Sequence, residues 1–176
     1  MTLDRLLIIR HAEQHDEPGL TADGEVDPHS LDPRGWQRAG ALAGFFGGAA
    51  AGLLKPDAIY ASAIAPGSES KRPQQTVAPL LALLRSAGAV SYRDTYGKHD
   101  IEPLMADVLT CSGTVLLSWE HSRIADCAAC LPNPPATPEK WPSDRYDLVW
   151  VFEPDGSGWS FRQVPQLLLA GDQPPG

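Results

Sequence analysis

The feature that most constrains the fold is a run of four aliphatic residues near the start of the chain, Leu6 to Ile9, which leads directly into Arg10 and His11. An uninterrupted apolar run of this length predicts a strand buried on both faces, as in a parallel sheet covered by helices. In an open α/β sheet, ligands bind just beyond the carboxyl ends of the strands. Arg10 and His11 therefore stand where a binding site is expected, although a histidine can also simply follow a core strand.

The rest of the chain alternates strand and helix patterns. This alternation predicts an α/β fold with three layers (α/β/α), a mainly parallel central sheet and an antiparallel edge strand. Further strands are expected at 58–61, 90–92, 114–119, 147–152 and 159–164, and helices after Asp32, from Arg72, and at 103–111 and 122–131. The turn sequence 153–156 predicts that the last two strands form a hairpin. Residues 1–170 are expected to form a single domain, and 171–176 a loose tail.

Local signals refine several of these elements. Asp32 and Pro33 are typical of a helix N-cap and first helical position. Pro79 interrupts the pattern of the helix that Arg72 opens, which predicts a kink or two separate pieces. The polar segment 13–31 has neither helical nor strand period and predicts a long loop of the binding or lid type. The proline-rich connection 132–142 is expected at the end of the sheet away from any site, without a chemical role.

Composition excludes some classes of function. A net charge of −8 argues against a nucleic-acid-binding surface, which needs a basic face. No apolar run approaches the roughly 20 residues that span a bilayer, and no signal peptide is recognisable, so we expect a cytoplasmic protein without membrane contact. Cys111, Cys127 and Cys130 are expected to be reduced thiols. Cys127 and Cys130 have the spacing of a redox or half-metal motif, but the small apolar residues around them favour a structural helix face.

Parallel connections bring the carboxyl ends of successive strands to one edge of the sheet. This edge is expected to carry Arg10, His11, Ser62, Arg72 and His121. Arginines offer planar donor pairs that suit phosphate oxygens, and a residue at a helix amino terminus lies where free N–H groups favour an anion. The sequence contains no lysine-bearing glycine-rich phosphate loop and no metal-ligand spacing, so neither a metal nor a cofactor is expected.

These stretches carry a family resemblance. Residues 6–13 resemble the Arg-His-Gly/Ala-Glu signature of the histidine phosphatase superfamily, also called phosphoglycerate mutase-like. Residues 31–39 resemble the helix after the family's lid loop, and residues 59–76 resemble its serine and arginine motif. His121 falls where the second histidine belongs. The resemblance spans roughly residues 5–131 and depends on these motifs occurring together and in order.

The resemblance implies a set of roles for the site residues. His11 would attack phosphorus and form a phosphohistidine, while Arg10, Arg72 and His121, with Ser62, would bind the phosphoryl oxygens, and Glu13 would support the pocket. The general acid that protonates the leaving oxygen is expected to be Asp100 or Glu102. The alternative interpretation of both carboxylates is that they are exposed loop acids or helix caps.

Departures from the family pattern narrow the expected activity. The segment 63–71 separates Ser62 from Arg72, where the family often has only a couple of residues. Ser122 follows His121 where acid-phosphatase-like members have an aspartate. The large insertions of cofactor-dependent phosphoglycerate mutases are missing, which favours a phosphohydrolase.

The expected substrate is a phosphorylated small molecule or a phosphoprotein. Lys98, Arg93 and Arg123 are candidates to contact a second charged group on it. Two other functions stay open at this point: a mutase or phosphohistidine protein phosphatase, and a catalytically idle phosphate-binding module. The oligomeric state is also left open.

Overall fold

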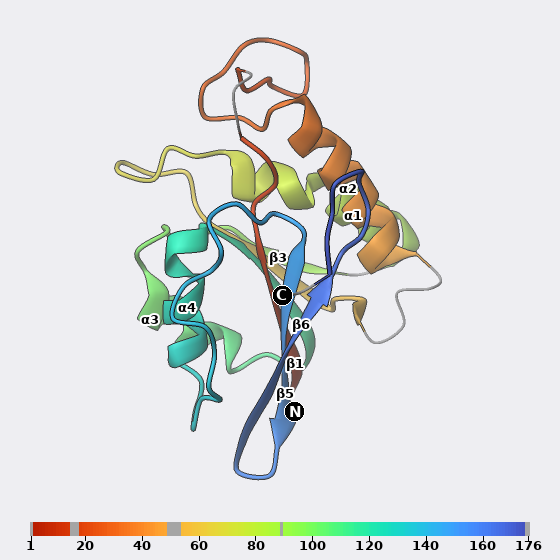
Figure 1. Ribbon diagram of the computed structural model, residues 1–176. Helices are drawn as coiled ribbons and strands as arrows, with labels where there is room; N and C mark the ends of the chain where they lie inside the picture. Colours follow the sequence, from red (N-terminus) through yellow and green to blue (C-terminus); the bar gives the residue numbers. More distant parts are fainter. Residues whose placement is uncertain (1, 15–17, 49–53, 89, 175–176) are drawn as a thin grey trace.

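The computed structural model describes residues 2–14, 18–48, 54–88 and 90–174 (Figure 1). Within these residues, six strands form one sheet in the order β3-β2-β4-β1-β5-β6. In that order the strands are β3 (Ser91–Arg93), β2 (Ala58–Ala61), β4 (Gly113–Trp119), β1 (Leu3–Arg10), β5 (Leu148–Asp155) and β6 (Gly158–Pro165). The helices are α1 (Pro33–Gly47), α2 (Arg72–Ala87), α3 (Ile101–Val108) and α4 (His121–Ala129).

The sheet is mainly parallel, as the sequence predicts. β1 pairs parallel with β4, and β2 pairs parallel with both β4 and β3. β5 runs antiparallel to β1, and β6 pairs antiparallel with β5 to close the hairpin at the edge. The amino-terminal end of β5 therefore lies beside the carboxyl end of β1, where a site is expected.

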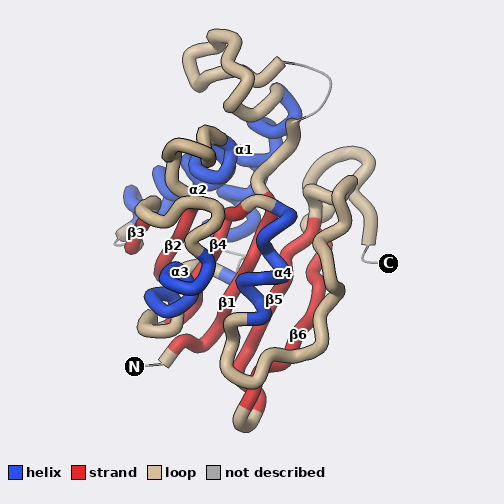
Figure 2. The backbone as a smooth tube through the Cα atoms, turned by 90° about the vertical axis from the view of Figure 1, so that its left-hand side faces the viewer, coloured by secondary structure: helices blue, strands red, loops and turns tan. Residues whose placement is uncertain are grey.

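Helices cover both faces of the sheet: α1 and α2 lie on one side, α3 and α4 on the other (Figures 1 and 2). Successive residues of β1 alternate between the two cores, since Leu6 and Ile8 pack with α3 and α4, and Leu7 and Ile9 pack with α1 and α2. All four are fully buried. The expectation of a strand covered on both faces, in a three-layer α/β/α fold, is confirmed.

The helix signals hold with one exception. Asp32 caps α1 by accepting a hydrogen bond from the Gly35 amide at 2.7 Å. The alternative of two helices around Pro79 is wrong, because α2 continues through it. Val77 and Leu80, on either side of this proline, are both buried in the core with α1, and this packing outweighs the backbone hydrogen bond that proline cannot make.

The end of the chain is attached to the domain, so the expectation of a loose tail does not fit residues 171–174. The Asp172 carboxylate accepts hydrogen bonds from the amides of Leu168 and Leu169 and pairs with Arg38, and the Gln173 amide donates to Asp147. Residues 175 and 176 of the predicted tail lie outside the described residues, as do residues 15–17 of the predicted loop.

Two further expectations concern the cysteines and the membrane. Cys111, Cys127 and Cys130 are all free thiols, and Cys127 is fully buried on the core-facing side of α4, in line with a structural role. In the described part of the chain, no helix combines the length and the apolar character that crossing a membrane requires.

Candidate active site

The carboxyl ends of β1 and β4 meet at the candidate site. The His11 amide donates a hydrogen bond to the Trp119 carbonyl at 3.0 Å, so Glu120 and His121 follow directly beside His11. A cavity of about 170 Å³ opens there. Its lining consists of His11, Gln14, Ser62, Ser68, Ser70, Arg72, Pro73, Lys98, Glu120 and His121. The structure thus brings together four of the predicted site residues, which come from three strand ends and one helix start.

The His11 imidazole is neutral and oriented. The residue is 3% exposed, and its Nδ1 lies 2.8 Å from the Ala12 carbonyl oxygen. Because a carbonyl can only accept, Nδ1 carries the proton and Nε2 keeps a free lone pair. Burial, together with the nearby charges of Arg10 and Arg72, lowers the pKa of His11 to about 3. Nε2 can therefore act as a nucleophile over the whole neutral range.

Arg72 and His121 flank the cavity as donors. Arg72, the first residue of α2, donates from Nε to the Ser30 carbonyl at 3.0 Å and also binds the Pro28 carbonyl, which ties the loop before α1 to the cavity. His121 opens α4. Its Nδ1 is buried and has no hydrogen-bond partner among the described residues, and burial lowers the pKa of its imidazole. A buried polar atom without a partner at a helix amino terminus is suited to receive an anion.

Arg10 lies behind the cavity and does not line it. Its guanidinium carbon stands 3.7 Å from the centre of the Tyr146 ring, and the group donates to the Tyr146 hydroxyl at 2.9 Å and to the Ser143 carbonyl. The segment 143–146 reaches Arg10 because β5 is antiparallel and begins at this end of the sheet. Sequence reasoning missed Tyr146, although the predicted hairpin already implied one strand that starts at the site.

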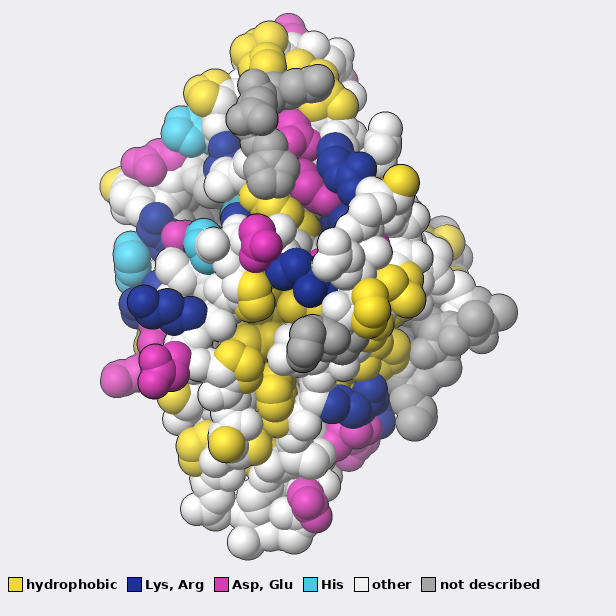
Figure 3. Space-filling model, in the orientation of Figure 1, with side chains coloured by type: hydrophobic (Ala, Val, Ile, Leu, Met, Phe, Trp, Pro, Cys, Tyr) yellow, Lys and Arg dark blue, Asp and Glu magenta, His cyan; other side chains and the backbone are white. Residues whose placement is uncertain are grey.

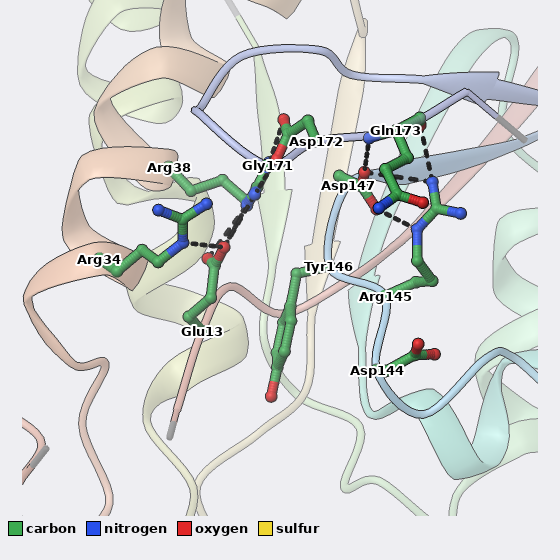
Figure 4. Close-up of a pocket in the computed structure, with 10 residues that line it drawn as sticks. All are labelled: Glu13, Arg34, Arg38, Asp144, Arg145, Tyr146, Asp147, Gly171, Asp172 and Gln173. Atoms are coloured by element: carbon green, nitrogen blue, oxygen red, sulfur yellow. Dashed lines mark hydrogen bonds and ion pairs between the residues drawn. The ribbon is translucent and has the colours of Figure 1, made fainter. Parts of the chain in front are cut away.

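Glu13 also does not line the cavity over His11. Its carboxylate pairs with Arg38 at 2.8 Å, and Arg38 pairs in turn with Asp172 at 2.7 Å. Burial alone would lower the pKa of Arg38, but the hydrogen bonds that it donates to Asp172 and Glu13 raise it above its ordinary value. Figure 4 shows this chain of charges, with Arg34 beside it, along a second cavity of about 260 Å³. Glu13 thus braces the loop after β1 from behind.

The two predicted acids are not at the cavity over His11. Asp100 and Glu102 line a different cavity, of about 420 Å³, between α3 and α4. Asp100 accepts a hydrogen bond from the Gly97 amide at 2.8 Å, which matches its alternative interpretation as an acid at the helix start. The structure therefore brings neither carboxylate to His11.

The cavity holds a different charged pair at its mouth. Lys98 Nζ and Glu120 Oε2 are 3.2 Å apart, and each side chain is about 29% exposed. Of the three basic residues considered for a second charged group on the substrate, only Lys98 lines this cavity, since Arg93 pairs with Asp107 and Arg123 with Asp126 elsewhere.

On the face drawn in Figure 3, histidines stand among basic and acidic side chains on the side of α3 and α4.

Among the described residues, no group of three or more His, Cys, Asp or Glu side chains could hold a metal ion.

No family model matches this sequence, and none of the curated proteins matches it. Solved structures match its fold over nearly the whole chain. A protein from Escherichia coli described as an alpha-ribazole-5'-P phosphatase superposes with a TM-score of 0.56 and 15% identity, covering 92% of this chain and 96% of its own. The chain has the histidine phosphatase fold.

Two phosphohistidine phosphatases, so described and called SixA, share the histidine phosphatase fold with this chain. The one from Agrobacterium tumefaciens has a TM-score of 0.54 and 19% identity, covering 92% of this chain and 97% of its own. The one from Nakamurella multipartitia has a TM-score of 0.52 and 20% identity, covering 92% and 96%. The fold match extends beyond residues 5–131, which carried the sequence resemblance, and accordingly includes part of the β5–β6 hairpin region.

Proposed function

We propose that this protein is a metal-independent phosphomonoesterase that works through a phosphohistidine intermediate on His11. The observation that carries the proposal is the buried, neutral imidazole, whose Nδ1 is bound to a carbonyl and which lines a cavity with Arg72 and His121. Phosphoryl transfer asks mainly for positioning and charge stabilisation, which these side chains can supply without a resident ion.

The reaction has two displacements at phosphorus. His11 Nε2 attacks in line, the bond from phosphorus to the ester oxygen breaks, and the phosphoryl group remains on the imidazole. Arg72, His121 and the Ser62 hydroxyl bind its oxygens. Water then attacks the phosphorus, the P–N bond breaks, and inorganic phosphate leaves with Nε2 restored. Arg10 contributes its positive charge from behind the cavity, where it also lowers the pKa of His11.

A phosphohistidine protein is the second candidate substrate. The two SixA structures are described as phosphohistidine phosphatases, and an imidazole leaving group uses the same displacement at phosphorus. The cavity of about 170 Å³ has room for a phosphoryl group and the first atoms attached to it. Both classes of substrate therefore belong in the first assay.

The test is phosphate release from p-nitrophenyl phosphate, a set of alkyl phosphates and a phosphohistidine peptide. Arg72→Ala should lower kcat/KM by about 10²- to 10³-fold, the usual cost of one lost donor to a developing charge, and weaken inhibition by inorganic phosphate. Arg162→Ala is the control, because Arg162 is half exposed on β6 and pairs with Glu153. Unchanged kinetics in Arg72→Ala would contradict this placement of Arg72.

The alternative of a catalytically idle phosphate-binding module predicts a different result. In that case no substrate in the panel is turned over, while phosphate or vanadate still raises the melting temperature of the wild-type protein. Isomerisation of 3-phosphoglycerate would instead point to a mutase.

A further inference from the structure

The leaving oxygen of an alkyl ester needs a proton, because a free alkoxide is a poor leaving group. The two carboxylates expected for this role, Asp100 and Glu102, line another cavity. In the described ranges, the cavity over His11 has one carboxylate in its lining, that of Glu120. We propose that Glu120 donates the proton to the leaving oxygen and later takes one from the attacking water, an inference that rests on the proposed phosphatase function.

The backbone places Glu120 beside the nucleophile. Arg10 is paired with Trp119 in the parallel β1–β4 register, and the next backbone contact runs from the His11 amide to the Trp119 carbonyl. Neighbouring strands lie about 4.8 Å apart, so Glu120 follows beside His11 at the same edge of the sheet. The side chain lines the cavity together with His11 and is partly exposed, so it is accessible to a bound substrate.

Two hydrogen-bond partners orient the carboxylate. Oε1 accepts from the Ser122 hydroxyl at 2.9 Å, and Oε2 faces Lys98 Nζ at 3.2 Å. The Lys98 backbone is itself fixed, since its carbonyl accepts a hydrogen bond from the buried Trp119 indole at 3.2 Å. Ser122 occupies the position where acid-phosphatase-like members of the family carry an aspartate. In this chain, Ser122 at that position instead donates a hydrogen bond to the carboxylate of Glu120, two residues earlier.

The groups around Glu120 act on its pKa in both directions. Burial raises the pKa of Glu120, but Ser122, Lys98 and His121 outweigh burial and hold it below its ordinary value. Arg10, Arg72, Tyr146 and the neutral His11 are further titratable groups at this edge of the sheet. A bound phosphoryl group adds negative charge next to Glu120, which favours the protonated carboxyl.

The proton balance closes over one turnover. A monoanionic phosphomonoester brings one proton, which Glu120 takes. As His11 Nε2 attacks, Glu120 passes this proton to the leaving oxygen, so that an alcohol departs and the carboxylate is ionised. Water then attacks the phosphohistidine and gives a proton to Glu120, which passes it to the departing phosphate, so that H2PO4− leaves and Glu120 is ionised again. No oxidant, metal or second substrate is required.

The experiment is a leaving-group series on Glu120→Gln, with Glu139→Gln as the matched control because Glu139 is exposed in the 132–142 connection. On an alkyl phosphate, Glu120→Gln should lower kcat by about 10²- to 10⁴-fold. On p-nitrophenyl phosphate, whose leaving group needs no proton, it should keep a pre-steady-state burst of nitrophenolate within a few-fold of the wild-type rate, followed by slow turnover. Unfolding curves for each variant verify that it is folded, and Glu120→Asp should recover part of the lost rate.

The pH profile separates proton transfer from a structural role. Lys98→Met removes a charge that lowers the pKa of Glu120, so the carboxyl stays protonated to higher pH. The pH above which kcat on the alkyl ester falls should therefore increase. Three results would each overturn the proposal. Glu120→Gln could lower the burst rate on p-nitrophenyl phosphate as much as the turnover of the alkyl ester, or Lys98→Met could leave the alkaline limb of kcat at its wild-type pH. Glu102→Gln could also be the variant that loses turnover of the alkyl ester but keeps the burst. If the wild-type protein is inert on every ester, the phosphatase function itself fails. An active wild type with an unaffected Glu120→Gln removes the role of Glu120 alone.

Discussion

Two features of its surroundings act on the imidazole of His11 in the same direction. It is almost completely buried, and it sits close to the positive charges of Arg10 and Arg72. Both features disfavour the imidazolium form, so the ring stays neutral, while the same cations favour an anion nearby. In the proposed reaction, one arrangement therefore serves both the free imidazole and the bound phosphoryl group.

The first prediction follows from the low pKa of His11. A histidine with a pKa of about 3 should show no imidazole titration by NMR between pH 5 and 8. The unfolded chain binds a proton at this residue below about 6.5, and the folded chain only below about 3, so the free energy of unfolding should fall as the pH drops through this window. His11→Asn should show a weaker pH dependence. A His11 signal that titrates near 6.5 would contradict the neutral nucleophile.

The sequence predicted those site residues that follow a strand or begin a helix. His11 and Ser62 come directly after β1 and β2, His121 comes two residues after the last residue of β4, and parallel connections bring such positions together. The sequence pointed to Asp100 and Glu102 as acids, but they lie at the start of α3, whose position relative to His11 depends on tertiary contacts. Glu120 had the same strand-end signal as His121, and its position was a usable clue.

At the scale of elements, the first turn of α1 packs against the loop that follows β1. A Cβ atom at Gly35 would lie 2.6 Å from the Glu13 carbonyl oxygen and 3.1 Å from the Leu31 side chain. Only glycine permits this approach, so the helix start and the loop that carries Glu13 are held together. The sequence predicted the N-cap from Asp32 and Pro33, but the closeness of the two backbones is a tertiary property.

The second prediction compares two glycines of the same helix. Gly35→Ala should destabilise the protein by about 1–3 kcal/mol and lower turnover, because the added methyl group displaces the backbone two residues after His11. Gly40→Ala, where the new Cβ meets open space, should stabilise it by about 0.5–1 kcal/mol. Urea unfolding and kcat measure both. Equal effects of the two substitutions would show that the Gly35 contact carries no strain.

At the scale of the whole molecule, the ends of the chain are joined through buried charges. Glu13, Arg38 and Asp172 connect the loop after β1, helix α1 and the carboxyl-terminal segment. Arg38 and Asp172 stand 134 positions apart in the sequence, and no local pattern marks such a pair. The sequence could therefore predict the sheet, the helices and the edge that holds the site, but not how the end of the chain closes behind it.

The third prediction tests this closure. Asp172→Ala leaves Arg38 with one fewer carboxylate and two backbone amides without their acceptor, so it should destabilise the protein by about 3–5 kcal/mol. Asp126→Ala breaks an exposed pair with Arg123 on α4 and should cost less than about 1 kcal/mol. Denaturant unfolding monitored by tryptophan fluorescence compares them. Similar small losses in both variants would mean that the end of the chain adds little to the stability of the domain.

The central claim is that His11 carries the phosphoryl group during turnover. The most direct measurement mixes the protein with p-nitrophenyl phosphate, quenches the reaction in alkali and locates bound phosphate by peptide mass spectrometry. The expected result is a base-stable, acid-labile phosphate on His11 that appears on the burst timescale and is missing in His11→Ala, together with turnover. Phosphate on another residue, or full turnover by His11→Ala, would contradict the account.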